Sequence, residues 1–102
     1  MENVGELVTP VGREWLLGIL QTEIVTITVE KLPGILNVVS CTLMENDMPN
    51  ELKPENAGLG FTRWKESLSS TQMAVFNTQS KGWYPLDLAK VRQVRYSQGT
   101  IS

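Results

Sequence analysis

The sequence predicts a small, mostly β domain of the α+β class, in which one helix precedes a five-stranded barrel. Three observations predict it. The spacing of apolar residues changes from every fourth to every second residue near Ile24. Tight-turn signals at 32–34 and 80–82 divide two pairs of short apolar runs. A polar stretch at 45–72, rich in Asn, Glu, Pro and Gly, separates these two pairs.

The first half of the chain predicts a helix and a hairpin. Thr9 and Pro10 form a helix start. A broad apolar stripe through Val11, Trp15 and Ile19, with Leu16 and Leu20 beside it, predicts a helix over 10–20. Strict alternation over 24–30 indicates a strand with one buried face. A second strand follows over 35–44 with apolar residues on both faces, so we expect it to be buried on both sides, under the helix and inside the barrel.

The second half predicts a long loop and three further strands. Residues 45–72 are expected to be a long variable loop, and such a loop in a small domain is usually functional or disordered. Strands at 73–77 and 83–87 form a hairpin, where Pro85 indicates an edge. The last strand, 91–96, needs a bulge to turn both Val91 and Val94 inward. Five short strands with tight turns are typical of an Sm/SH3-like barrel.

Several of these segments carry a family resemblance. The strand "IVTITVEK", then "CTLMENDMP" from Cys41, "MAVFNTQSKGW" from Met73 and "PLDLAKV" from Pro85 together resemble the WYL-like family of small tailed-phage proteins. The resemblance covers about residues 14–96. It implies an Sm/SH3-type barrel and a phage origin more than a function. The chain departs from the family at Tyr84 and Pro85, where such proteins carry Arg and Ser.

Composition predicts one soluble domain without a metal or a cofactor. The 102 residues are predicted to form a single domain with flexible tails at 1–8 and 97–102. The chain has no histidine and one cysteine, Cys41, which excludes an internal disulfide and a histidine-based metal site. No apolar run is long enough to span a bilayer, and the N-terminus lacks a signal-peptide pattern. We therefore expect no membrane contact and a location in the cytoplasm, specifically of the host cell if the phage resemblance holds.

Catalysis is not expected. The commonest general base, histidine, is missing, and Asp47 and Asp87 lie far apart in the sequence. Cys41 lies between apolar strand neighbours, which favours a small buried side chain over a thiolate nucleophile. Gly58 and Gly60 lack the third glycine and the preceding strand of a phosphate-binding loop. The sequence therefore predicts a binding protein with no catalytic residues.

Two kinds of partner remain open. The first is a protein, expected to be a host protein that the chain inhibits or redirects. Its predicted contact is an aromatic and basic cluster, which would face the partner if exposed or close over the core if folded back. An edge strand could also pair with a partner or with a second copy of the chain. The predicted contact residues are Phe61, Arg63, Trp64 and Lys65.

The alternative partner is an anionic ligand, either single-stranded nucleic acid or a nucleotide. Residues 1–50 hold two basic and seven acidic residues, whereas 51–102 hold seven basic and four acidic ones. A basic barrel face with aromatic rings could stack bases and bind phosphates. Of its two neighbouring rings, Trp83 is expected to pack in the hairpin core and Tyr84 to be the exposed one. The candidate residues are Lys81, Trp83, Tyr84, Lys90, Arg92 and Arg95.

Overall fold

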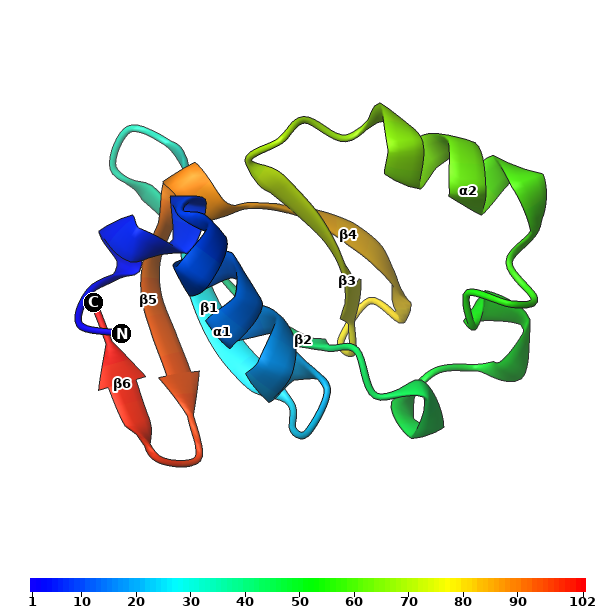
Figure 1. The fold of residues 1–102 in the computed structure, drawn as a ribbon, viewed down its shortest axis with the longest axis horizontal. Coiled ribbons are helices and arrows are strands. Elements are labelled where there is room, and N and C mark those ends of the chain that lie inside the picture. The colour runs from blue at the N-terminus through cyan, green and yellow to red at the C-terminus, as the bar shows by residue number, and fades with distance from the viewer.

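The computed structural model describes residues 1–102 as an α+β fold built on one antiparallel sheet (Figure 1). Six strands form this sheet in the order β4-β3-β2-β1-β5-β6. The helices are α1 (Pro10–Leu20) and α2 (Gly58–Ser67), and the strands are β1 (Val25–Leu32), β2 (Ile35–Thr42), β3 (Gln72–Asn77), β4 (Gly82–Asp87), β5 (Val91–Tyr96) and β6 (Gly99–Ile101). Four 3₁₀ turns join them: η1 (Val4–Val8), η2 (Glu45–Asp47), η3 (Asn50–Leu52) and η4 (Leu88–Lys90).

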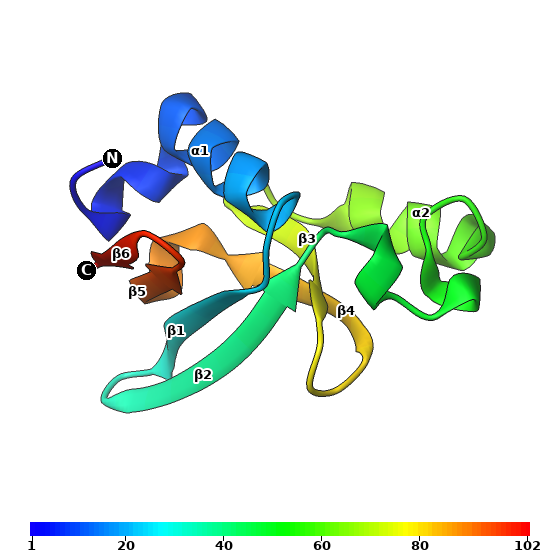
Figure 2. The ribbon, with the colours of Figure 1, turned by 90° about the horizontal axis from the view of Figure 1, so that it is seen from below.

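The sheet is open, so the predicted closed five-stranded barrel is wrong in strand number and in closure. All strand pairs are antiparallel, as expected. The central pair is short, because β2 meets β3 only at Cys41↔Asn77 and Thr42↔Phe76. Beyond that contact the β1–β2 and β3–β4 hairpins diverge, as Figure 2 shows. The two outer strands, β4 and β6, do not pair with each other.

Both chain ends are ordered, so the predicted flexible tails at 1–8 and 97–102 are wrong. Residues 4–8 form η1, and its Leu7 side chain is fully buried. Residues 99–101 form β6 against β5, which buries Ile101. The backbone N–H of Val4 donates to the carbonyl of Ser102 at 3.2 Å, so the termini lie side by side (Figure 1). A short segment with one buried residue has no periodic pattern, so neither η1 nor β6 could be predicted from the sequence.

Helix α1 has the predicted bounds, and its predicted apolar stripe faces the core except at Val11. The Thr9 hydroxyl accepts a hydrogen bond from the Gly12 N–H at 3.1 Å, which caps the helix start as predicted. Leu16 and Leu20 point into the core, whereas Val11 from the expected stripe is 82% exposed. Gly12 lies directly under the backbone of η1, where a larger residue would not fit. Because η1 packs on Gly12, this residue faces the protein interior and its neighbour Val11 faces solvent.

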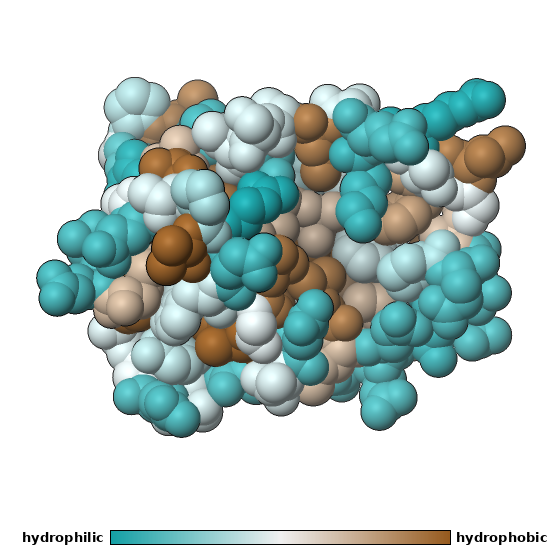
Figure 3. Space-filling model, viewed as in Figure 1, coloured by the Kyte–Doolittle hydropathy of each residue, from teal (hydrophilic) through white to brown (hydrophobic).

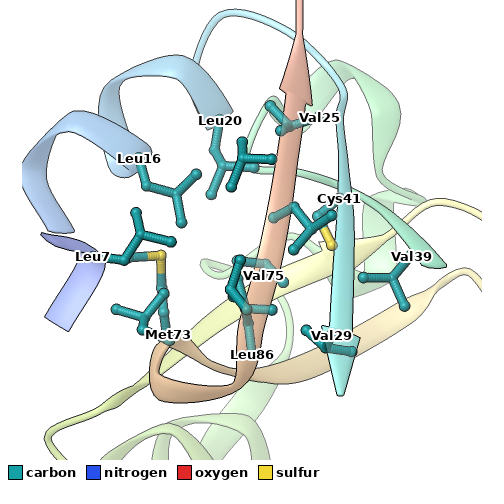
Figure 4. Close-up of a cluster of buried hydrophobic side chains, with 14 residues drawn as sticks. Leu7, Leu16, Leu20, Val25, Val29, Val39, Cys41, Met73, Val75 and Leu86 are labelled. Carbon is teal, nitrogen blue, oxygen red and sulfur yellow. The ribbon is translucent and has the colours of Figure 1, made fainter. Parts of the chain in front are cut away.

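The main core lies between α1 and one face of the sheet (Figure 4). Leucines of η1 and α1 meet valines of β1 and β5 and the hydrophobic side chains of β3 and β4. The expected bulge in β5 is present, because the register shifts opposite Thr28 and Val29 and both Val91 and Val94 are buried. The core comprises Leu7, Leu16, Leu20, Val25, Ile27, Val29, Val39, Cys41, Met73, Val75, Leu86, Leu88, Val91 and Val94.

The segment from Glu45 to Thr71 is not the unstructured loop that its composition predicts. It contains η2 and η3 and then the ten-residue helix α2. Gly58 begins that helix at φ +80°, a conformation that glycine adopts without strain. Neither this helix nor α1 is long and apolar enough to cross a membrane. We call residues 45–71 the arm, because they leave the sheet after β2 and return to it at β3 (Figures 1 and 2).

Candidate functional site

The arm extends to one side of the sheet and is attached to it at a few points. No residue of α2 is buried. At the end where the arm rejoins β3, the Arg13 guanidinium donates to the Ser70 carbonyl of the arm at 3.4 Å. In the middle, the indole N–H of Trp83 donates to the Leu52 carbonyl at 2.8 Å. Most of the surface of α2 is therefore free, which Figure 3 shows as a largely hydrophilic side of the molecule.

Four aromatic rings join α2 to the sheet, and we call them the aromatic stack: Trp64, Phe61, Trp83 and Phe76. The Phe61 and Trp83 ring centroids are 4.7 Å apart, and Phe76 meets Trp83 edge-on at 6.0 Å. Among the aromatic rings, Trp64 pairs with Phe61 alone, with 6.0 Å between centroids. Such pairs contribute about 0.5–1.5 kcal/mol each beyond their area burial. Phe61 thus lies inside the stack, and Trp64 lies at its outer end.

The structure separates the four predicted partner residues into two groups. Phe61 and Trp64 are half-buried, so the alternative that they fold back over the core describes Phe61 well. Arg63 and Lys65 are exposed on α2. Leu59, which the sequence reasoning missed, is 71% exposed on the same helix. Its apolar character between two glycines is the sequence signal that could have found it.

Only part of the predicted anionic-ligand set comes together. Tyr84 and Lys90 line a cavity of about 210 Å³ between β1 and β4. Lys31, which the sequence did not point to, also lines this cavity, and its Nζ lies 5.6 Å from the Tyr84 ring centroid. Burial raises the pKa of the Tyr84 hydroxyl, and the neighbouring Cys41 and Asp87 raise it further. The predicted exposure of Tyr84 is thus wrong, because its ring packs against the core.

The other four residues of that set lie apart from the cavity's lining. Trp83 belongs to the aromatic stack, on the opposite sheet face from Tyr84 as the strand alternation requires. Lys81 is in the β3–β4 turn at φ +56°. The Arg92 Nε binds the Glu30 carboxylate at 3.0 Å, which helps the Gly34 N–H to lower the pKa of Glu30. Arg95 is exposed on β5.

A further surface, the tip of the β1–β2 hairpin, carries exposed apolar side chains. Leu32, Ile35, Leu36 and Val38 are 64%, 54%, 58% and 57% exposed. The prediction that β2 is buried on both sides is therefore wrong for its first half, because the hairpin extends beyond the core (Figure 2). A sequence signal was available, since no charged residue occurs between Lys31 and Glu45.

Cys41 and the acidic residues do not form a reactive or metal-binding centre. Cys41 is fully buried, and burial raises the pKa of its thiol to about 12. No three Cys, Asp or Glu side chains lie together as a metal site would require. Comparisons with family models, with curated proteins and with solved structures found no match to the chain. The resemblance to small tailed-phage proteins stays a prediction.

Proposed function

We propose that this chain is a non-enzymatic binding protein that contacts a protein partner through the free face of α2 in the arm. The observation that carries the proposal is a surface helix with no buried residue that nevertheless holds a tryptophan, a leucine and two cations. Trp and Arg contribute most to interface energies. Trp64 is the proposed anchor, and Leu59, Arg63 and Lys65 surround it.

The aromatic stack supports this proposal by fixing the helix before the partner arrives. Phe61 and Trp83 hold α2 in place, so binding does not require the arm to fold. A preorganised surface loses less conformational entropy on association than a flexible loop does. A disordered loop, by contrast, would have to fold as it binds its target. In this proposal the aromatic stack holds α2 against the sheet, and the outer face of α2 binds the partner.

The nature of the partner follows from the family resemblance alone. If the chain is a phage protein, its partner is a host protein that it inhibits or redirects in the host cytoplasm. We likewise propose that strands β1–β5 are related to the Sm/SH3-like fold, with β6 as an additional strand. It is supported by the order of helix, hairpin, arm, hairpin and strand along the chain.

Photo-crosslinking tests the proposed surface and captures the partner in the same step. A photoreactive phenylalanine analogue replaces Arg63 in one variant and Thr100, an exposed residue of β6, in a control. We expect one dominant crosslinked protein from host cells for the position 63 variant and none for the position 100 variant. Equal crosslinking at both positions, or crosslinking only at position 100, would show that the arm is not the contact.

The cavity between β1 and β4 favours a second candidate function, the binding of an anionic ligand. Lys31, Tyr84 and Lys90 place two cations and an aromatic ring around one opening, which also holds the carboxylate of Asp87. A phosphate beside the lysines and a base against the ring would use all three groups. Neither lysine belongs to the arm, so this function is separable from the first.

Titration with a fluorescent oligothymidylate and with ATP tests the second function. Binding should weaken as salt increases and should be lost when Lys31 and Lys90 are both replaced by Glu. Replacing Lys53 and Lys65 on the arm by Glu together is the charge-matched control and should leave binding unchanged. Salt-insensitive binding, or equal losses in both variants, would argue against this cavity.

A further inference from the structure

We propose that two copies of this chain form a symmetric dimer by pairing the free edge of β2 antiparallel with the same edge of the second copy. We call residues 35–39 of β2 the hairpin edge. It lies on the β1–β2 hairpin, away from the arm and its stack (Figure 2). The inference is therefore independent of the proposed partner contact.

Unpaired backbone groups are the first argument. The Ser40 carbonyl accepts the Thr78 N–H at 2.8 Å, so the backbone of Ser40 faces away from β1. Alternate residues of a strand direct their N–H and C=O groups to the same side, so those of Leu36 and Val38 face this side too. Strand β3 has left β2 by that point, because their pairing is limited to Cys41 and Thr42. Two donors and two acceptors are thus available to another strand.

The hairpin edge lacks the features that usually prevent strand pairing. Exposed edges are normally short, charged or interrupted by proline. The two outer strands of this sheet follow the rule: β4 contains Pro85, and β6 has three residues. The hairpin edge has no proline and no charge, and it carries the exposed Ile35, Leu36 and Val38. We expect an apolar, uncharged edge of this kind to be covered by another polypeptide strand in the functional protein.

The edge is complementary to itself, which identifies a second copy as the occupant. With a two-fold axis at Asn37, Leu36 lies opposite Val38 of the second copy, and Val38 lies opposite its Leu36. These two pairs exchange four hydrogen bonds and use every free group of Leu36 and Val38. The four side chains then form one apolar patch on the outer sheet face. Ile35 meets Val39 of the second copy, and no like charges oppose each other.

Mass measurement tests the dimer. In light scattering across a concentration series, the wild-type chain should approach twice its 11.4 kDa mass. Val38→Lys should remain at the monomer mass, because the two lysines would lie beside apolar residues in the dimer. Val11→Lys is the matched control, since Val11 is even more exposed but lies on α1. A wild-type chain that stays monomeric throughout the series would overturn the inference, even if a different protein binds this edge.

A disulfide tests the register. In the proposed pairing, Asn37 faces Asn37 of the second copy with about 4.5 Å between Cα atoms, which is within the range for a disulfide. Asn37→Cys should therefore form a linked dimer on mild oxidation, while the buried Cys41 stays reduced. Leu36→Cys is the control one residue away, and it should crosslink much more slowly. Equal rates for both variants would contradict the register and overturn the proposed pairing.

Discussion

Removal of the Trp83 ring should release the arm while leaving the main core intact. Trp83 contacts Phe61 and Phe76 and donates to the Leu52 carbonyl at 2.8 Å. Trp83→Phe keeps the stacking but loses the hydrogen bond, which costs about 1 kcal/mol. Trp83→Ala also loses the stacking, and because the ring is only half-buried we expect about 3 kcal/mol, the lower end for such truncations.

These losses can be followed by urea unfolding and by amide hydrogen exchange. One kcal/mol lowers the melting temperature by about 4–8 °C in a chain of this size, so the two variants are easily distinguished. In Trp83→Ala, exchange should accelerate in α2 but not in β1. Trp15→Ala is the control, because Trp15 packs edge-on against Tyr96 on the other side of the molecule. If α2 exchanges equally slowly in Trp83→Ala and in wild type, the stack does not hold the arm.

Three further predictions concern single residues. Gly12→Ala should destabilise the fold by more than about 2 kcal/mol in urea unfolding, because its Cβ would overlap the backbone of η1. Gly18→Ala, in the same helix with open space around it, should instead stabilise by about 0.5–1 kcal/mol, and the opposite order would contradict the α1 packing. Native Cys41 should react with a thiol reagent only after denaturant is added, since its thiol is buried with a pKa of about 12; rapid labelling would show an open core. Arg92→Ala should change stability little in the same unfolding assay, because its ion pair with Glu30 lies at the surface; a loss as large as that of Gly12→Ala would contradict this.

Local patterns in the sequence predicted most of the fold. The Thr9–Pro10 cap, the alternation after Ile24 and the bulge between Val91 and Val94 all match the structure. Each depends on interactions among neighbours in the chain or on one strand pairing. The failures involve distant contacts. The open sheet depends on where β2 separates from β3, and no local pattern encodes that separation.

The candidate site was less predictable for the same reason. The sequence grouped Phe61 with Trp64 because they are three residues apart. In the structure Phe61 packs against Trp83 of the sheet, whereas Trp64 lies at the outer end of the aromatic stack. Likewise, Lys31 joins Tyr84 and Lys90 only through the pairing of β1 with its neighbours. The sequence shows that β2 is apolar, but it does not show which of these apolar residues are buried in the core and which are exposed.

The most direct test of the arm as the partner contact is a comparison of Trp64→Ala with Thr62→Ala, an exposed neighbour on α2. Stability is measured by thermal unfolding, and affinity by calorimetry with the crosslinked partner once it is purified. Trp64→Ala should weaken binding by about 2 kcal/mol or more. Its melting temperature should fall by about 4–8 °C, because it loses one ring pair worth about 1 kcal/mol. Thr62→Ala should change neither quantity much. If Trp64→Ala lowers the melting temperature by clearly more than this and leaves the affinity intact, Trp64 supports the fold, and the contact must lie elsewhere, around Tyr84, Lys90 and Arg92.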